Sequence, residues 1–195
     1  LGVASHIIAN VIWTFVILRS CYGGGSIAEK IKRLDVRLRE WYAQNRCTSK
    51  LQGKLTPERL RATGAWPKLK CKAAATRKLA LFALEIAATF SGGSDEDRTI
   101  VEVCRLLVRF YQILDDESQF LSEAARSELP RLGQTLAELY SKLATLAYDR
   151  GEKLWKLSPK LHLFMHLCMW QALELGNPRW YWTYGDEDLV GSMID

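Results

Sequence analysis

The chain has 195 residues, of which 48% are hydrophobic and 25% charged, and its formal net charge is +5. This balance is typical of a globular protein with a core of its own, and it excludes a chain that is disordered throughout. The five cysteines are spread singly, without a C-x-x-C pair. This pattern argues against a disulfide framework or a zinc ribbon, and it indicates a reducing, intracellular location.

Segments with helical periodicity dominate the sequence, so the predicted fold class is mainly α, a helical bundle. The first helix is predicted from Val3 to Leu18, an apolar run that includes His6 and Asn10. Because such polar side chains are costly inside lipid, we expect a buried helix and no membrane partner.

A second helix is predicted from Ile27 to Asn45, with Ser26 as its N-cap. Its apolar stripe consists of Ile27, Ile31, Leu34, Leu38, Trp41 and Tyr42. A short helix from Pro57 to about Gly64 and a long one from about Lys68 to Phe90 follow. Together, residues 27–90 form the basic helical part.

Residues 94–175 are predicted to form the bundle part. One helix begins at the Ser94 cap, and a short element spans Glu117 to Ser127. Further helices are predicted to begin at Pro130 and at Pro159, the latter running to about Leu175.

Residues 176–195 are predicted to hold a short aromatic strand, Trp180 to Tyr184, and an acidic helix start. The chain begins with Leu1 inside an apolar run and stops within this last helix. We therefore expect residues 1–195 to be a single helical domain or a fragment of a larger protein.

Charge is unevenly distributed along the chain. Residues 28–78 contain fifteen Lys/Arg and four Asp/Glu, a net charge of +11, whereas residues 91–195 contain eleven and seventeen, a net charge of −6. A basic surface can neutralise DNA phosphates, and Trp41, Tyr42 and Trp66 could stack on single-stranded bases. The alternative is a solvated basic face, or one that docks on an acidic partner. The candidate nucleic-acid contacts are Lys30, Lys32, Arg33, Arg37, Arg39, Arg46, Lys50, Lys54, Lys68, Lys70 and Lys72.

Two groups of side chains could bind metal. His162 and His166 lie four residues apart, on one side of a predicted helix, but Leu163 stands where a zinc protease needs Glu. Packing of both histidines in a helix interface is the favoured interpretation. The second group is a run of acids, which either complements a helix dipole or supplies a ligand for two-metal phosphoryl transfer. These acids are Asp186, Glu187 and Asp188.

Two stretches follow one another in a distinctive order. The first is the apolar run Leu1–Ile12 with its Asn-Val pair, and the second extends from Pro159 to Gly191. The second combines Pro-Lys-x-His, a later His, the turn at residues 176–178, the aromatic run and the acids. In this order they resemble the segment after the second catalytic aspartate, and the C-terminal block, of cut-and-paste DNA transposases of the CACTA and Kyakuja–Dileera–Zisupton types.

The resemblance implies a ribonuclease-H-like core interrupted by a helical insertion. The last metal-binding acid would be Glu187, with Asp186 the neighbouring choice, and it would bind Mg²⁺ or Mn²⁺ with support from His162 and His166. The family more often has Gly-Pro where Gly-Asn-Pro stands here, and the adjacent acids leave the ligand ambiguous.

The other two acids of such a site would precede Leu1. We therefore expect a transposon-derived, DNA-acting fragment that is nuclear, inactive alone and dependent on the remainder of its parent protein. The alternative is a helical protein-interaction or scaffold module without a nucleic-acid role.

Overall fold

The computed structural model describes residues 2–181, which are mainly helical and contain no β-strand. The prediction of a mainly α, bundle-like fold is therefore confirmed. In chain order the helices are α1 (Gly2–Ile12), the π-helix η1 (Trp13–Leu18), α2 (Ile27–Gln44), α3 (Pro57–Leu60), α4 (Ala73–Phe90), α5 (Asp95–Asp116), α6 (Glu123–Asp149), α7 (Pro159–His166), the π-helix η2 (Leu167–Gln171), α8 (Ala172–Leu175) and the 3-10 helix η3 (Pro178–Trp180).

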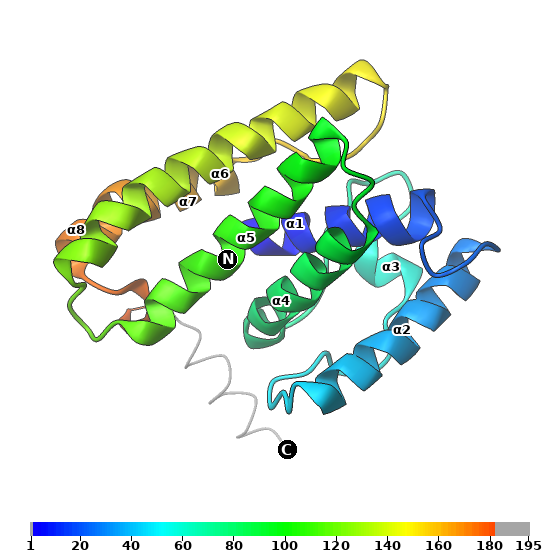
Figure 1. The fold of residues 1–195 in the computed structure, drawn as a ribbon, viewed down its shortest axis with the longest axis horizontal. Helices are drawn as coiled ribbons and strands as arrows, with labels where there is room; N and C mark the ends of the chain where they lie inside the picture. The colour runs from blue at the N-terminus through cyan, green and yellow to red at the C-terminus, as the bar shows by residue number, and fades with distance from the viewer. Residues whose placement is uncertain (1, 182–195) are drawn as a thin grey trace.

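The central element is α1 with its continuation η1, which α4, α5 and α7 contact (Figure 1). All of residues 3–12 are buried, because this helix is apolar around its circumference. Its polar members are satisfied locally: His6 Nδ1 donates to the Pro67 carbonyl at 3.0 Å, and Asn10 Nδ2 donates to the His6 carbonyl at 2.7 Å. The expected buried helix is confirmed, and none of the helices within residues 2–181 combines the length and apolarity needed to cross a bilayer.

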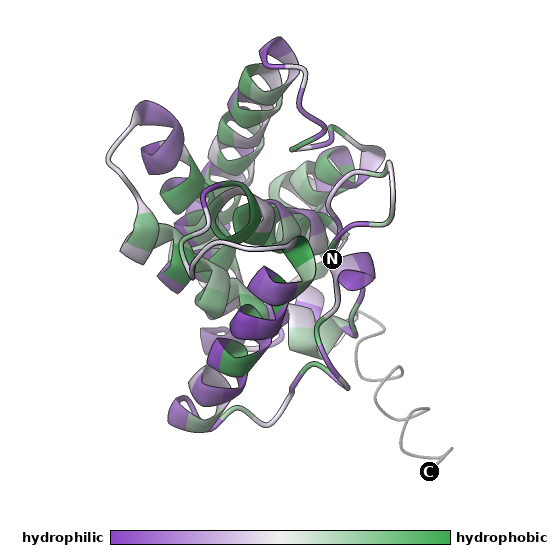
Figure 2. Cartoon of the chain, turned by 90° about the vertical axis from the view of Figure 1, so that its right-hand side faces the viewer, coloured by the Kyte–Doolittle hydropathy of each residue, from purple (hydrophilic) through white to green (hydrophobic). Residues whose placement is uncertain are grey.

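Successive helices α4, α5 and α6 pack side by side, α4 and α5 contact α1, and α7 with η2 lies against α6. Hydrophobic residues gather where the helices meet, and hydrophilic residues face outward (Figure 2). The close approach of α6 to η2 depends on Gly133, since a Cβ there would lie 2.6 Å from Cys168 Cβ.

Helix α2 extends away from this bundle and contacts η1 and α3. Ser26 and Glu29 form the capping box that fixes its start, which confirms the predicted N-cap. The predicted apolar stripe is buried, except for Ile27, which is exposed. Trp41 joins the helix to α4, where it packs on Phe82 and donates to Glu85 at 2.8 Å.

The prediction of a helix beginning at Pro130 is wrong, because α6 runs unbroken from Glu123 and contains Pro130. The Ser122 hydroxyl caps the start by accepting from the Ala125 amide at 3.3 Å. Pro130 removes one backbone hydrogen-bond donor, but the buried apolar residues of α6 before and after it pack continuously on α5. Tertiary packing thus overrides the local helix-start signal.

Two further boundaries differ from the prediction. Helix α4 begins at Ala73 rather than Lys68, because residues 68–70 run beside α3: Lys68 N–H donates to the Leu60 carbonyl, and Lys70 N–H to the Arg59 carbonyl, both at 2.8 Å. Trp180 lies in η3 rather than in a strand, and residues 182–184 fall outside the described part of the chain.

Candidate nucleic-acid interface

Residues 46–72, called the basic segment below, connect α2 to α4 and contain eight Lys/Arg but a single acid, Glu58. Apart from the four residues of α3, the basic segment is irregular. Hydrogen bonds fix it in place: the Leu51 amide donates to the Tyr42 hydroxyl at 3.1 Å, and the Leu55 amide to Asp35 at 2.9 Å. Both leucines are buried, so the segment is anchored by apolar side chains, while six of its eight cations are exposed and Arg59 and Arg61 are half-buried.

Four of the eleven predicted phosphate contacts already have partners inside the protein. Lys30 donates to the Ile17 carbonyl at 2.7 Å, and Arg33 donates to the carbonyls of the Gly-rich turn. Arg37 pairs with Glu40, and Arg39 with Asp35. All four side chains thus hold α2 and its neighbouring turns, and acids on the same helix offset the charges of Arg37 and Arg39.

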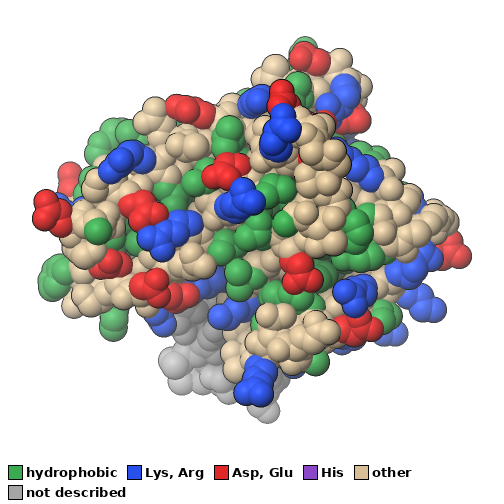
Figure 3. All heavy atoms as spheres, viewed as in Figure 1, with side chains coloured by type: hydrophobic (Ala, Val, Ile, Leu, Met, Phe, Trp, Pro, Cys, Tyr) green, Lys and Arg blue, Asp and Glu red, His purple; other side chains and the backbone are tan. Residues whose placement is uncertain are grey.

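The side chains of the other seven predicted contacts form no hydrogen bond or ion pair with any described residue, and all seven are exposed. Six of them lie in the basic segment. They are Lys32, Arg46, Lys50, Lys54, Lys68, Lys70 and Lys72. On the face drawn in Figure 3, Lys and Arg side chains recur along the right and lower edges, where α2 lies in Figure 1.

Lys50 and Lys72 meet at a surface cavity of about 450 Å³, between the start of the basic segment and the first turn of α4. The hydroxyl residues Thr48 and Ser49 share its lining. A smaller cavity of about 210 Å³ adjoins it and is lined by Lys50 and Arg39. The sequence predicted that Lys50 and Lys72 belong to one basic surface, but it did not predict that both line the same cavity.

The first turn of α4 was missed as part of this surface. No side chain caps it, and no acid stands in its first turn, while residues 74 and 75 line the larger cavity. Unsatisfied amides at a helix start carry partial positive charge and favour anions. The predicted start at Lys68 concealed this feature, although Lys72 offers no capping side chain and Ala73–Ala75 form a helix-favouring run.

The expected base stacking by Trp41 and Tyr42 is wrong, because both rings are buried. Trp41 packs on Phe82, and the Tyr42 hydroxyl accepts from Leu51. Burial raises the pKa of Tyr42 to about 12, so its hydroxyl stays protonated at neutral pH. Trp66 is half-buried. The basic surface thus presents its lysines without the rings of Trp41 and Tyr42.

His162 and His166 do not pack in a helix interface, which corrects the favoured interpretation. His162 is exposed and His166 half-buried, and their Nε2 atoms face each other at 2.7 Å. Trp170 lies against His166, with the ring centroids 4.3 Å apart. The structure therefore brings this predicted pair together at the surface, while Asp186, Glu187 and Asp188 lie outside the described residues.

Two of the described thiols are held in the unreactive, protonated form by burial. Burial raises the pKa of Cys21 to about 11 and that of Cys104 to about 12, so both remain thiols at neutral pH. Within residues 2–181, no three side chains of the metal-binding types come together. The cationic surface is therefore the best-developed candidate site. No protein-family model, curated protein or solved structure matches the chain.

Proposed function

We propose that this chain binds the phosphate backbone of duplex DNA through its basic segment and the adjoining start of α4. The observation that carries the proposal is the set of seven exposed cations whose side chains have no partner among the described residues, six of which lie in one anchored connection. Unpaired lysines can exchange condensed counterions for phosphate contacts, which is the main source of sequence-independent affinity for DNA.

Duplex is favoured over single-stranded DNA because Trp41 and Tyr42 are buried. Proteins that hold single strands combine a cationic groove with exposed aromatic rings. Contacts from lysine to phosphate position a protein on DNA but do not read its sequence. The proposed binding is therefore weakly specific for sequence and strongly dependent on salt.

The proposal includes the role implied by the transposase resemblance, a helical insertion that holds DNA while a ribonuclease-H-like core performs catalysis. Glu187 would supply one ligand for Mg²⁺ or Mn²⁺, and the remainder of the parent protein would supply the other acids. The chain alone is then expected to show no metal-dependent strand cleavage. Cleavage by the purified chain that Glu187→Ala removes would contradict this part of the proposal without affecting DNA binding.

A salt titration tests the binding proposal. We expect the logarithm of the association constant for a 20-bp duplex to fall linearly with the logarithm of salt concentration. With about four phosphates contacted, the slope is about −3.6, and affinity falls about a hundredfold between 50 and 200 mM salt. A slope near zero, or no binding at 50 mM salt, would contradict the proposal.

A second candidate is the helical protein-interaction module. It is favoured by large exposed apolar side chains in the C-terminal part of the described chain, namely Leu157, Leu163, Trp170, Leu175, Trp180 and Tyr181. Apolar surface of this kind marks interaction sites when it is contiguous. Concentration-dependent association of the chain that Trp170→Ser reduces, together with an absence of DNA binding, would favour this candidate.

A further inference from the structure

The two surface histidines of α7 form an arrangement that DNA binding does not use. Helical spacing places His162 and His166 one turn apart, and their side chains are turned so that both Nε2 atoms meet at 2.7 Å. Trp170, one turn further along η2, packs on His166 and restricts the orientation of that ring.

Two imidazole nitrogens this close have two ways to interact. In one, the Nε2–H of one ring donates to the Nε2 of the other. In the alternative, both rings carry their proton on Nδ1 and both Nε2 lone pairs bind one metal ion. The second arrangement needs only a small rotation of the exposed His162 ring, because metal–nitrogen bonds of about 2.1 Å at a right angle separate the nitrogens by about 3.0 Å.

We propose that His162 and His166 form a two-histidine site for a divalent transition metal with an affinity for imidazole, such as Ni²⁺ or Cu²⁺. A tetrahedral zinc site would require the nitrogens to separate further, to about 3.3 Å. The observed 2.7 Å therefore favours ions that accept ligands at right angles. Mg²⁺ prefers oxygen ligands and is not expected to bind here.

The site has an incomplete protein coordination sphere within residues 2–181, where no third metal-binding side chain joins the pair. Water or an external ligand would fill the remaining positions of the bound ion. Structural zinc sites have four protein ligands, and catalytic ones commonly three. The pair would therefore form a surface site of moderate affinity, whose imidazole ligands differ in type from the carboxylate that Glu187 was expected to supply to Mg²⁺ or Mn²⁺.

The test uses the full 195-residue chain, free of any histidine tag, and titrates it with Ni²⁺ by calorimetry. We expect one ion per chain, and at least a tenfold loss of affinity in each of His162→Gln and His166→Gln. These variants keep all five cysteines and the buried His6, so they control for binding elsewhere. A Trp170→Phe variant should keep the affinity while losing the part of the Ni²⁺-induced fluorescence quenching that comes from the indole beside His166.

A second measurement needs no substitution. In the ¹⁵N-labelled wild-type chain, paramagnetic Ni²⁺ should broaden backbone amide signals centred on residues 162–170. Broadening centred elsewhere would overturn the proposal, as would Ni²⁺ affinity that is unchanged in both histidine variants. Failure of the folded wild-type chain to bind Ni²⁺ would also overturn it.

Discussion

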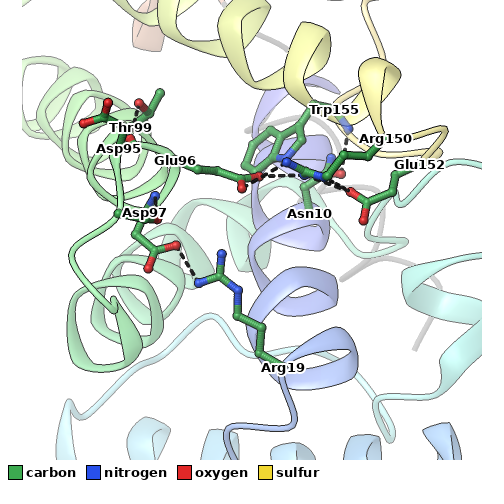
Figure 4. Close-up of polar contacts among 10 residues, drawn as sticks. Asn10, Arg19, Asp95, Glu96, Asp97, Thr99, Arg150, Glu152 and Trp155 are labelled. Carbon is green, nitrogen blue, oxygen red and sulfur yellow. Dashed lines mark hydrogen bonds and ion pairs between the residues drawn. The ribbon is translucent and has the colours of Figure 1, made fainter.

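The bundle and the basic segment differ in whether their charged and polar side chains have partners within the protein. In the bundle these groups pair across elements: Arg150 bonds Glu96 at 2.8 Å, and Asn10 accepts from the Trp155 amide at 2.8 Å (Figure 4). In the basic segment, Lys50 and Lys72 line a surface cavity, and their side chains have no partner within residues 2–181. The net charge of a region is thus a poor guide to a binding surface, and the distribution of partners is a better one.

The comparison predicts that substitutions in the bundle mainly change stability, whereas substitutions of unpaired lysines mainly change binding. Figure 4 also shows Arg19 reaching Asp97 at 2.5 Å, an ion pair that joins the end of η1 to the start of α5. Only 2% of the Asp97 side chain is exposed. Such contacts fix the bundle, and their loss leaves buried groups unsatisfied.

The largest expected effect is that of Asn10→Ala. Asn10 is fully buried and joins the His6 carbonyl to the amide of Trp155, whose φ is +53°. Its loss leaves both backbone groups without that partner, so the free energy of unfolding should fall by about 2–4 kcal/mol. Urea denaturation measures it. Gln112→Ala, at an exposed glutamine of α5, is the control and should cost at most about 0.5 kcal/mol; equal losses in both variants would contradict the expectation.

Gly176→Ala comes next. Gly176 has φ +86°, and a Cβ there would overlap the carbonyl oxygen of Gln119. The backbone amide of Asn177 donates a hydrogen bond to that same oxygen at 2.9 Å. Strain and overlap together should lower the free energy of unfolding by about 2–3 kcal/mol. Gly151→Ala controls for strain alone, since φ is +69° and the space is open. Its cost should be about 1 kcal/mol; a Gly176→Ala cost no larger than this would show that the close approach to Gln119 has no energetic role.

A pH dependence of stability should follow from His6. Burial is the main cause of its lowered pKa, opposed by the bond to Pro67. Below the ordinary pKa of 6.5 the unfolded chain takes up a proton that the folded chain resists. Stability is therefore fully present above pH 6.5 and is lost as the pH falls, by at most about 1.4 kcal/mol per pH unit.

Denaturation between pH 7.5 and 5 measures this loss. The double variant His162→Gln, His166→Gln lacks the surface imidazoles and should retain the full pH dependence. Its disappearance in that variant would assign the effect to the surface pair instead of to His6.

The smallest expected effect on stability is that of Lys50→Glu with Lys72→Glu. Both side chains are exposed and lack a partner in the described part of the chain, so the free energy of unfolding should change by less than about 0.5 kcal/mol. Thermal or urea denaturation measures it. A loss comparable to that of Asn10→Ala would mean that these lysines stabilise the fold, and it would remove the contrast between the two regions.

Local patterns predicted the helices well wherever an apolar stripe and a cap agree. The stripe of α2 and its Ser26–Glu29 box are the clearest case, and the Ser94 cap of α5 is another. Pro130 shows the limit of such signals, because a proline typical of a helix start lies inside α6. Packing on α5 decides that boundary, and no local pattern contains it.

The candidate site was predictable as a list of cations but not as a geometry. The sequence could not show that Arg37 and Arg39 pair with acids on their own helix while Lys50 and Lys72 remain unpaired. The cavity depends on long-range bonds such as that between Leu55 and Asp35. Helical spacing did place His162 and His166 on one face, but their exposure depends on which face of α7 packs on α6.

Two charge-matched double variants show whether the unpaired cations of the basic segment bind DNA. One is Lys50→Glu with Lys72→Glu. The other is Arg126→Glu with Lys142→Glu on α6, where both exposed side chains also lack a described partner. Each pair changes the net charge by the same amount, so overall charge cannot explain a difference between them.

Duplex binding is measured for both variants over a salt series. We expect the basic-segment variant to lose at least tenfold in affinity and to show a salt slope shallower by about 1.8, corresponding to two lost phosphate contacts. The α6 variant should keep the wild-type slope. Equal losses in the two variants, or no loss in either, would contradict the account.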